Sequence, residues 1–155
     1  GPSGSGKSTA VAELCRSGWK QMSDDLTPYD PDSRQAHSLP TTIAYRQPGG
    51  DRLSKEELLS SPKEHMHVES ERLQDTPVRP EAIFFPTFEA GRPAEAEDLP
   101  TPEAAVSLIE SCQNVGRYRG EALRELSRLA SQVPSFRLRY NSQSDIPGLL
   151  TSAIG

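Results

Sequence analysis

Residues 1–8 of this chain read Gly-Pro-Ser-Gly-Ser-Gly-Lys-Ser and fill every position of the phosphate-binding pattern G-x-x-x-x-G-K-[S/T]. Its glycines permit positive φ angles, which turn backbone N–H groups inward to form an anion-binding nest. Lys7 is expected to reach the β- and γ-phosphates, and the Ser8 hydroxyl to ligate Mg²⁺. The helix that follows adds its positive N-terminal end. The pattern predicts a site for a nucleoside triphosphate such as ATP, with Mg²⁺. The residues expected to contact the nucleotide are Gly1, Ser3, Gly4, Ser5, Gly6, Lys7, Ser8 and Thr9.

The place of this loop in the chain leads to a second expectation. A phosphate-binding loop follows a buried β-strand, and no residue precedes Gly1. We therefore expect the sequence to be a fragment of a longer protein from which at least one N-terminal strand is missing. Residues 1–155 are expected to form a single domain.

Composition excludes several functional classes. The chain has 22 Asp and Glu against 17 Lys and Arg, a net charge of −5, which argues against general nucleic-acid binding. It has no apolar run long enough to span a membrane. Cys15 and Cys112 show neither a disulfide framework nor metal spacing, which favours a cytoplasmic protein. One basic cluster, interpreted as a solvated helix face, consists of Arg117, Arg119, Arg124 and Arg128.

Periodicity and turn residues predict a mixed α/β fold. The expected elements of the first part are a helix over 7–17 stopped by Gly18, a strand over 19–23, two short strands around the turn Asp30-Pro31-Asp32-Ser33, a strand over 42–46 ended by Pro48-Gly49-Gly50, and a helix to about residue 60 with a capping box of Ser54 and Glu57.

The second part of the chain is expected to be less regular at first. We predict a mobile loop over 61–80 and a linker over 89–100, because both are polar and rich in proline. The elements expected around them are a buried strand Ile83-Phe84-Phe85 ended by Pro86, a helix that starts at Thr101-Pro102, a helix over 120–132 with Leu123, Leu126 and Leu129 on its apolar stripe, a strand over 136–140, and a last helix capped by Ser144-Asp145.

Asp24 and Asp25 form the second strong feature of the chain. Phosphoryl transfer needs a carboxylate near the γ-phosphate, either to orient the metal or to accept the proton of the attacking hydroxyl. A strand over 19–23 would deliver this pair to the phosphate-binding end of the sheet. Successive strand residues alternate between faces, so only one of the two can point at the phosphate. We favour Asp24 as the general base, and Asp25 as a residue that holds Mg²⁺ through water or braces the loop; the alternative is an ordinary turn after a strand.

These residues carry a resemblance to a known family. The loop, the short helix that ends at Arg16-Ser17-Gly18 and the run Met22-Ser23-Asp24-Asp25 resemble the nucleotide-binding core of HPr kinase/phosphorylase. The likeness is closer to the HPr-kinase-related serine kinases of bacterial peptide-modification (lasso-peptide-type) systems, and phosphoenolpyruvate carboxykinases share a similar core. Residues 39–46, 83–88 and 110–140 resemble these relatives more diffusely.

The resemblance implies ATP-dependent phosphorylation of a serine on a small protein or peptide, with catalytic roles for Lys7, Asp24 and Asp25 and metal-binding roles for Ser8 and Asp25. The glycine-rich signature of true HPr kinase/phosphorylases is absent. Two other functions stay open: a small-molecule P-loop kinase of the guanylate-kinase kind, and a regulatory module that binds a nucleotide without catalysis. Whether copies of the chain form a homo-oligomer is also left open.

Weaker candidates have ordinary structural interpretations. His65 and His67 alternate near several glutamates, but a Zn²⁺ site would need further ligands at defined spacing. Arg46 could hold a phosphate or be an exposed residue at a strand end. Trp19 is interpreted as a packing residue.

Overall fold

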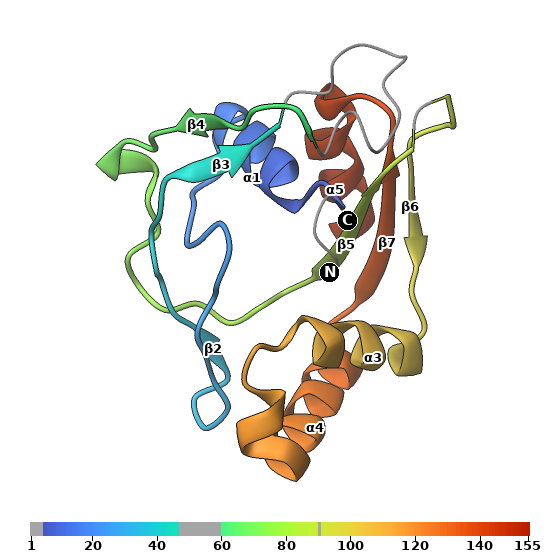
Figure 1. Cartoon of the computed structure of the whole chain (residues 1–155). Coiled ribbons are helices and arrows are strands. Elements are labelled where there is room, and N and C mark those ends of the chain that lie inside the picture. Colours follow the sequence, from blue (N-terminus) through green and yellow to red (C-terminus); the bar gives the residue numbers. More distant parts are fainter. Residues whose placement is uncertain (1–4, 47–59, 90) are drawn as a thin grey trace.

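The computed structural model describes residues 5–46, 60–89 and 91–155, and it is a mixed α/β fold (Figure 1). The order of elements is α1 (Lys7–Arg16), β1 (Tyr29–Asp30), β2 (Gln35–Ala36), β3 (Ile43–Tyr45), β4 (Glu64–Met66), η2 (Ser70–Arg72), β5 (Ile83–Phe88), β6 (Glu95–Asp98), α3 (Thr101–Ser111), α4 (Val115–Gln132), β7 (Ser135–Tyr140), η3 (Gln143–Asp145) and α5 (Ile146–Ile154).

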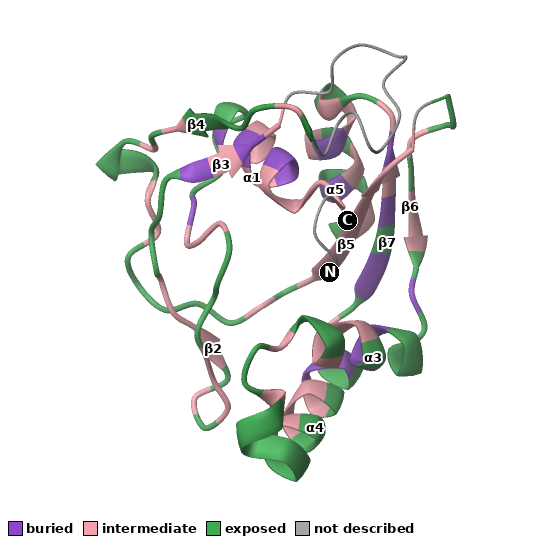
Figure 2. Ribbon diagram, viewed as in Figure 1, coloured by how far each residue is buried: buried purple, intermediate pink, exposed green. Residues whose placement is uncertain are grey.

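The largest sheet of the described residues has three strands in the order β5-β7-β6. The central strand β7 runs parallel to β5 and antiparallel to β6. It is the most buried of the three, as Figure 2 shows in purple. Its alternation Phe-Arg-Leu-Arg-Tyr places Phe136, Leu138 and Tyr140 on one face, as the sequence predicted. On the other face, Arg139 forms ion pairs with Glu95 and Glu97 of β6.

Helices α1 and α5 pack on this sheet, whereas α3 and α4 lie beyond the lower ends of its strands (Figure 1). On one face, α1 and α5 pack on β7 through a cluster that includes Ala10, Leu138, Tyr140 and Ile146. On the opposite face, Phe85 contacts the cluster that joins α3 to α4. Phe84 and Phe85 thus point to different clusters, because neighbouring strand residues alternate. The described residues are consistent with the expected α/β class, and a complete P-loop kinase core stays a prediction.

Helix α1 lies between the main sheet and the small sheet of β3 and β4. Ala10 faces the main sheet, whereas Ala12 and Cys15 face Ile43 and Tyr45 of β3. Small side chains allow this close approach on two sides of one helix. The predicted bounds of 7–17 agree closely with the observed helix, which ends at Arg16 and is followed by Gly18 with φ of 99°. The positive φ explains why glycine follows the helix end.

The strand predicted over 19–23 is a wrong prediction. Only Gln21 makes a bridge, its N–H and C=O pairing with Arg72 O at 2.8 Å and Gln74 N at 2.7 Å. A strand requires a continuous run of backbone partners, and the neighbouring segment turns through η2 and supplies partners for one residue. Asp24 and Asp25 therefore follow a bend instead of a strand end.

Two other expectations for strands also need correction. Pro86 does not end β5, which continues to Phe88. Among the described strands β5 lies at the edge of its sheet, so the missing N–H of Pro86 removes no ladder bond on the open side. The segments predicted as a loop and a linker contain β4, whose partner is β3, and β6, whose partner is β7. The charged side chains on the solvent-facing sides of β4 and β6 made both segments resemble polar loops in the sequence.

The remaining elements follow the prediction more closely. The hairpin of β1 and β2 is closed by Asp30, whose side chain accepts from Asp32 N at 3.0 Å and Ser33 Oγ at 2.6 Å. Helix α3 begins at Thr101-Pro102 as expected. The predicted Pro48-Gly49-Gly50 break and the capping box of Ser54 and Glu57 lie outside the described residues.

The C-terminal helices differ from the prediction in detail. Helix α4 begins at Val115, earlier than expected, and has a kink at Arg119, where φ is 30°. Leu123 of its predicted core stripe is exposed, because only the later part of α4, around Leu129 and Ala130, is buried. The capping box before α5 is formed by Ser142 and Asp145, so the predicted Ser144 is one of the residues inside η3.

Candidate functional site

The described end of the phosphate-binding loop passes directly into α1. Gly6 is the N-cap residue with φ of 95° and ψ of 10°, a left-handed conformation that favours glycine. Its carbonyl oxygen accepts the first helical hydrogen bond, from Ala10 N at 2.9 Å. The helical ladder thus begins at Ala10 N, and the backbone N–H groups of the residues before it in α1 point back toward the loop. This is the local geometry that the sequence pattern requires at its sixth and seventh positions.

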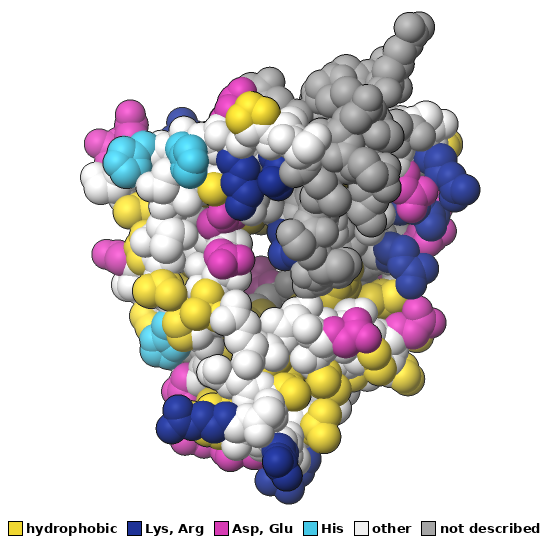
Figure 3. Space-filling view, viewed as in Figure 1, with side chains coloured by type: hydrophobic (Ala, Val, Ile, Leu, Met, Phe, Trp, Pro, Cys, Tyr) yellow, Lys and Arg dark blue, Asp and Glu magenta, His cyan; other side chains and the backbone are white. Residues whose placement is uncertain are grey.

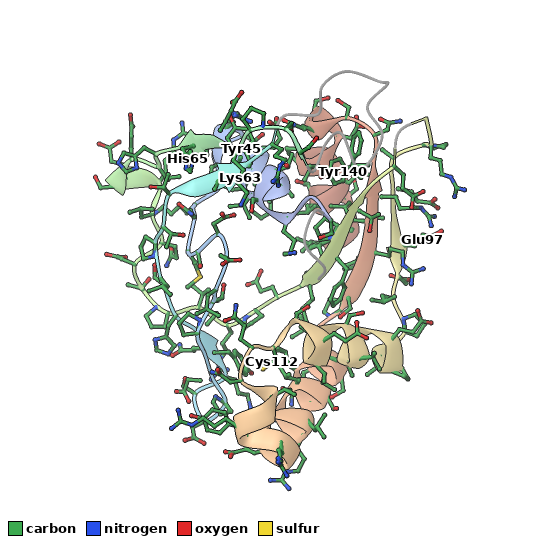
Figure 4. All side chains as sticks on the ribbon, in the orientation of Figure 1. Tyr45, Lys63, His65, Glu97, Cys112 and Tyr140 are labelled. Atoms are coloured by element: carbon green, nitrogen blue, oxygen red, sulfur yellow. The ribbon has the colours of Figure 1, made fainter. Side chains whose placement is uncertain are left out.

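Tyr140 anchors this end of the loop to the main sheet. It is the last residue of β7, and its hydroxyl donates to Gly6 O at 3.3 Å. Figure 4 labels Tyr140 where β7 meets α5. The neighbouring parallel strand β5 ends at Phe88. The ring of Phe88 lies edge-on to that of Tyr140, with the ring centroids 5.7 Å apart. The loop end thus lies at the carboxyl ends of two parallel strands, the edge at which α/β sheets commonly bind ligands.

Sequence reasoning did not identify Tyr140. A tyrosine at the end of an alternating strand carries no local signal for a contact 134 positions away. The glycine at position 6 is the one sequence feature that the contact explains, because a Cβ atom at this position would lie 2.0 Å from the Tyr140 hydroxyl oxygen. Burial raises the pKa of Tyr140 to about 12, so the hydroxyl keeps its proton and remains a donor at neutral pH.

The polar side chains of the loop lie near one another. Lys7 Nζ is 3.4 Å from Ser5 Oγ, so the lysine head group folds back over the loop instead of extending into solvent. Ser8 is half-buried in the first turn of α1. Thr9 is buried, and its hydroxyl donates to Arg46 O at 3.2 Å, which fastens α1 to the residue after β3. Gly1, Ser3 and Gly4 lie outside the described residues.

The two acids occupy different environments. Asp24 is half-buried, and its Oδ2 accepts from Ala44 N of β3 at 3.3 Å. Its Oδ1 is buried and has no hydrogen-bond partner among the described residues. Asp25 is exposed. The two side chains therefore differ in burial, and the segment that carries them is a bend and not a strand. Their predicted division of roles stays a prediction.

Strand β3 connects Asp24 with the loop end of α1. Ala44 binds Asp24, and Arg46, two residues later, binds Thr9. Two residues of extended chain span about 6.5 Å, so Asp24 and the first turn of α1 bind neighbouring points, one within β3 and one directly after it. Arg46, which the sequence suggested as a phosphate ligand, uses its Nε to bind Ser61 O at 3.0 Å.

The C-terminal end of α1 is a separate polar environment. Burial raises the pKa of the Cys15 thiol; the guanidinium of Arg72 opposes this shift, and the charge of Asp24 adds to it. Arg72 also donates to Cys15 O, which satisfies one of the carbonyl groups at the helix end. Cys15 is 3% exposed, so this thiol is a packing residue.

Other candidates from the sequence do not gather into a site. Among the described residues there is no group of three His, Cys, Asp or Glu side chains that could hold a metal, and His67 Nδ1 lies 3.4 Å from Thr42 Oγ1. Trp19, interpreted as a packing residue, is 40% exposed. The predicted arginine cluster belongs to α4. Figure 3 shows Lys and Arg side chains at the lower end of the molecule, the region in which Figure 1 draws α4.

A pocket of about 250 Å³ lies away from the loop. It is bounded by the start of α3 and the end of α4, with Asp98, Thr101 and Ser135 among its lining residues. Neither the loop nor the acid pair contributes to it. No helix within the described parts of the chain has the length and apolar character needed to cross a membrane.

The chain stands apart in comparisons with known proteins: no protein-family model, curated protein or solved structure matches it.

Proposed function

We propose that this chain is the nucleotide-binding domain of an HPr-kinase-like serine kinase, which transfers a phosphoryl group from ATP to a small protein or peptide. The observation that carries the proposal is the complete G-x-x-x-x-G-K-S pattern, whose last residues form a left-handed glycine followed at once by a helix. The position of this helix start at the carboxyl ends of β5 and β7 supports the same proposal.

The residues at the loop suit Mg-ATP. The backbone N–H groups at the start of α1 and the Lys7 ammonium group are donors of the kind that phosphate oxygens accept. The Ser8 hydroxyl is one Mg²⁺ ligand, and Asp25 acts on the metal through water. Mg²⁺ keeps several waters and uses phosphate oxygens, so it needs no cluster of three protein ligands. Mg-ATP would supply the transferable phosphoryl group and the charge neutralisation that the transfer requires.

Asp24 is proposed as the general base. Its Oδ1 is buried and has no hydrogen-bond partner among the described residues, so it would accept the proton of the acceptor serine only after that serine gains access to it. The Ala44 amide binds the other oxygen. The serine oxygen forms a bond to the γ-phosphorus, the bond from that phosphorus to the β,γ-bridging oxygen breaks, and ADP leaves. Lys7 stabilises the negative charge on the transferred group.

A nucleotide-binding module without catalysis is the second candidate. The hydrogen bond from Ala44 N to Asp24 favours it, because that bond gives the acid a structural role that requires no substrate. Both candidates predict ATP binding, and they differ in phosphoryl transfer.

The test uses the full-length protein with γ-labelled ATP and Mg²⁺. Lys7→Ala should weaken ATP binding tenfold or more, since a charge-assisted contact contributes about 1.5–3 kcal/mol. Lys20→Ala is the matched control, because Lys20 is exposed beyond the other end of α1. Equal affinity in wild type and Lys7→Ala would overturn the nucleotide site. Label that moves to a serine of an added peptide or lysate protein supports the kinase, whereas binding without any transfer supports the second candidate.

A further inference from the structure

The hydrogen bond from Tyr140 to Gly6 restricts the orientation of the peptide group between Gly6 and Lys7. The carbonyl of Gly6 and the N–H of Lys7 belong to the same planar, trans peptide unit, so they point in opposite directions. A donor that holds the Gly6 oxygen therefore also determines where the Lys7 N–H points. That N–H is one of the groups at the helix start that the proposed nucleotide site would use.

The Gly6 oxygen has two donors in the structure. Ala10 N, which belongs to α1, lies 2.9 Å from it. The hydroxyl of Tyr140, the last residue of β7, lies 3.3 Å from it. A carbonyl oxygen has two lone pairs, and both are used here. Without Tyr140, one helical hydrogen bond would hold this oxygen. Helix ends are the part of a helix that opens most easily, and glycine has the greatest backbone freedom of any residue.

Tyr140 is itself held firmly. Its side chain is 1% exposed, and it belongs to the strand that pairs on both sides. Its backbone oxygen accepts from Glu89 N at 2.9 Å, and its ring contacts Phe88. A rigid donor restricts the Gly6–Lys7 peptide more than a mobile one would.

We propose that the Tyr140 hydroxyl is a positioning group for nucleotide phosphates, which acts by holding the Gly6–Lys7 peptide so that the Lys7 N–H faces the phosphate site. The inference rests on the proposed function. Glycine at position 6 is part of the same arrangement, since any Cβ atom there would displace the hydroxyl. A tyrosine hydroxyl is protonated across the neutral range in any case, and burial raises its pKa further, so the interaction persists there.

The test compares Tyr140→Phe with Tyr118→Phe, both in the full-length protein. Tyr140→Phe removes the hydroxyl and keeps the ring that packs on Phe88, whereas Tyr118 is an exposed tyrosine on α4. Affinities for Mg-ATP, ADP and adenosine are measured by titration. We expect Tyr140→Phe to weaken binding of ATP and ADP about two- to tenfold, the range for one hydrogen bond, and to leave adenosine affinity unchanged. Equal losses for all three ligands would show a purely structural role and overturn the inference, as would unchanged affinities.

A second readout does not require the variant to bind nucleotide. In the protein without ligand, the Lys7 backbone amide should shift in its NMR spectrum and exchange faster with solvent in Tyr140→Phe than in Tyr118→Phe. In the wild type, the same amide should be among those that shift most when Mg-ATP is added. An unaltered Lys7 amide in Tyr140→Phe contradicts the positioning role even if ATP binds. Failure of the wild type to bind Mg-ATP contradicts the proposed function itself.

Discussion

The hydroxyl of Tyr140 and the carbonyl oxygen of Gly6 lie 3.3 Å apart and join the end of the central strand to the start of α1. The contact is possible only because residue 6 has no side chain, since a Cβ atom there would be 2.0 Å from the hydroxyl oxygen. Backbone conformation and packing thus require glycine at this position for two separate reasons.

The first prediction concerns Gly6→Ala. The left-handed backbone alone should cost about 1–2 kcal/mol for alanine, and the collision with Tyr140 should add about 1–3 kcal/mol. Chemical denaturation measures the total loss. The matched control is Gly148→Ala in α5, where no neighbouring atom lies within 4 Å and φ is not positive; it should stabilise the protein by about 0.5–1 kcal/mol.

A double-mutant cycle separates the two costs of Gly6→Ala. Tyr140→Phe should cost about 1 kcal/mol in the wild type, and it should be neutral or stabilising when Gly6→Ala is present, because the colliding hydroxyl has gone. Additive losses would mean that the two residues do not touch.

The second prediction is a pH dependence that Tyr140 causes. The pKa of a tyrosine is about 10 in the unfolded chain and is raised to about 12 here by burial. A raised pKa adds stability that is fully present below pH 10 and is lost as the pH rises toward 12. Relative to Tyr140→Phe, the wild type should lose about 2–3 kcal/mol of unfolding free energy over this range. The difference in tyrosinate absorbance between the two proteins should show a midpoint near pH 12; a midpoint near pH 10 would place the hydroxyl in water.

The third prediction tests the proposed general base. Asp24→Asn keeps an acceptor for Ala44 N but removes the proton acceptor, so phosphoryl transfer should fall by roughly 10²–10⁴-fold while ATP affinity stays nearly the same. Asp75→Asn, at an exposed position, should change neither value. Single-turnover transfer and titration with ATP measure the two quantities. Parallel losses of affinity and rate would indicate a metal ligand instead, and an unchanged rate would leave Asp24 a structural residue that caps β3.

The fourth prediction concerns the two cysteines. Burial raises the pKa of Cys15 and shields its sulfur, whereas Cys112 follows α3 and is only half-buried. At neutral pH an alkylating reagent should modify Cys112 first, and Cys15 only after unfolding. Mass spectrometry of the labelled peptides distinguishes the sites, and Cys112→Ser serves as the control that leaves Cys15 alone. Rapid labelling of Cys15 in the folded protein would show that α1 does not pack on β3 as described.

Several features could be predicted from sequence because they depend on neighbouring residues. The phosphate-binding pattern placed the start of α1, and Gly18 its end, because both positions need positive φ angles. The proline ring at the start of α3 fixes a backbone angle that suits a helix start. The Asp30 side chain stabilises the turn of the first hairpin by accepting a hydrogen bond from Asp32 N. The alternation of β7 also follows from two-residue periodicity alone.

Tertiary structure decided the features that depend on distant partners. Residues 19–23 have strand-like composition but form a β-bridge only at Gln21. Pro86 remains within β5 because the open side of an edge strand requires no donor. β4 and β6 exist because β3 and β7 supply their hydrogen bonds. The sequence by itself determined where the loop turns into a helix, through local steric and hydrogen-bond rules. Only the packing of β7 against α1 brought Tyr140 to Gly6, since a contact over 134 positions depends on the path of the whole chain between them.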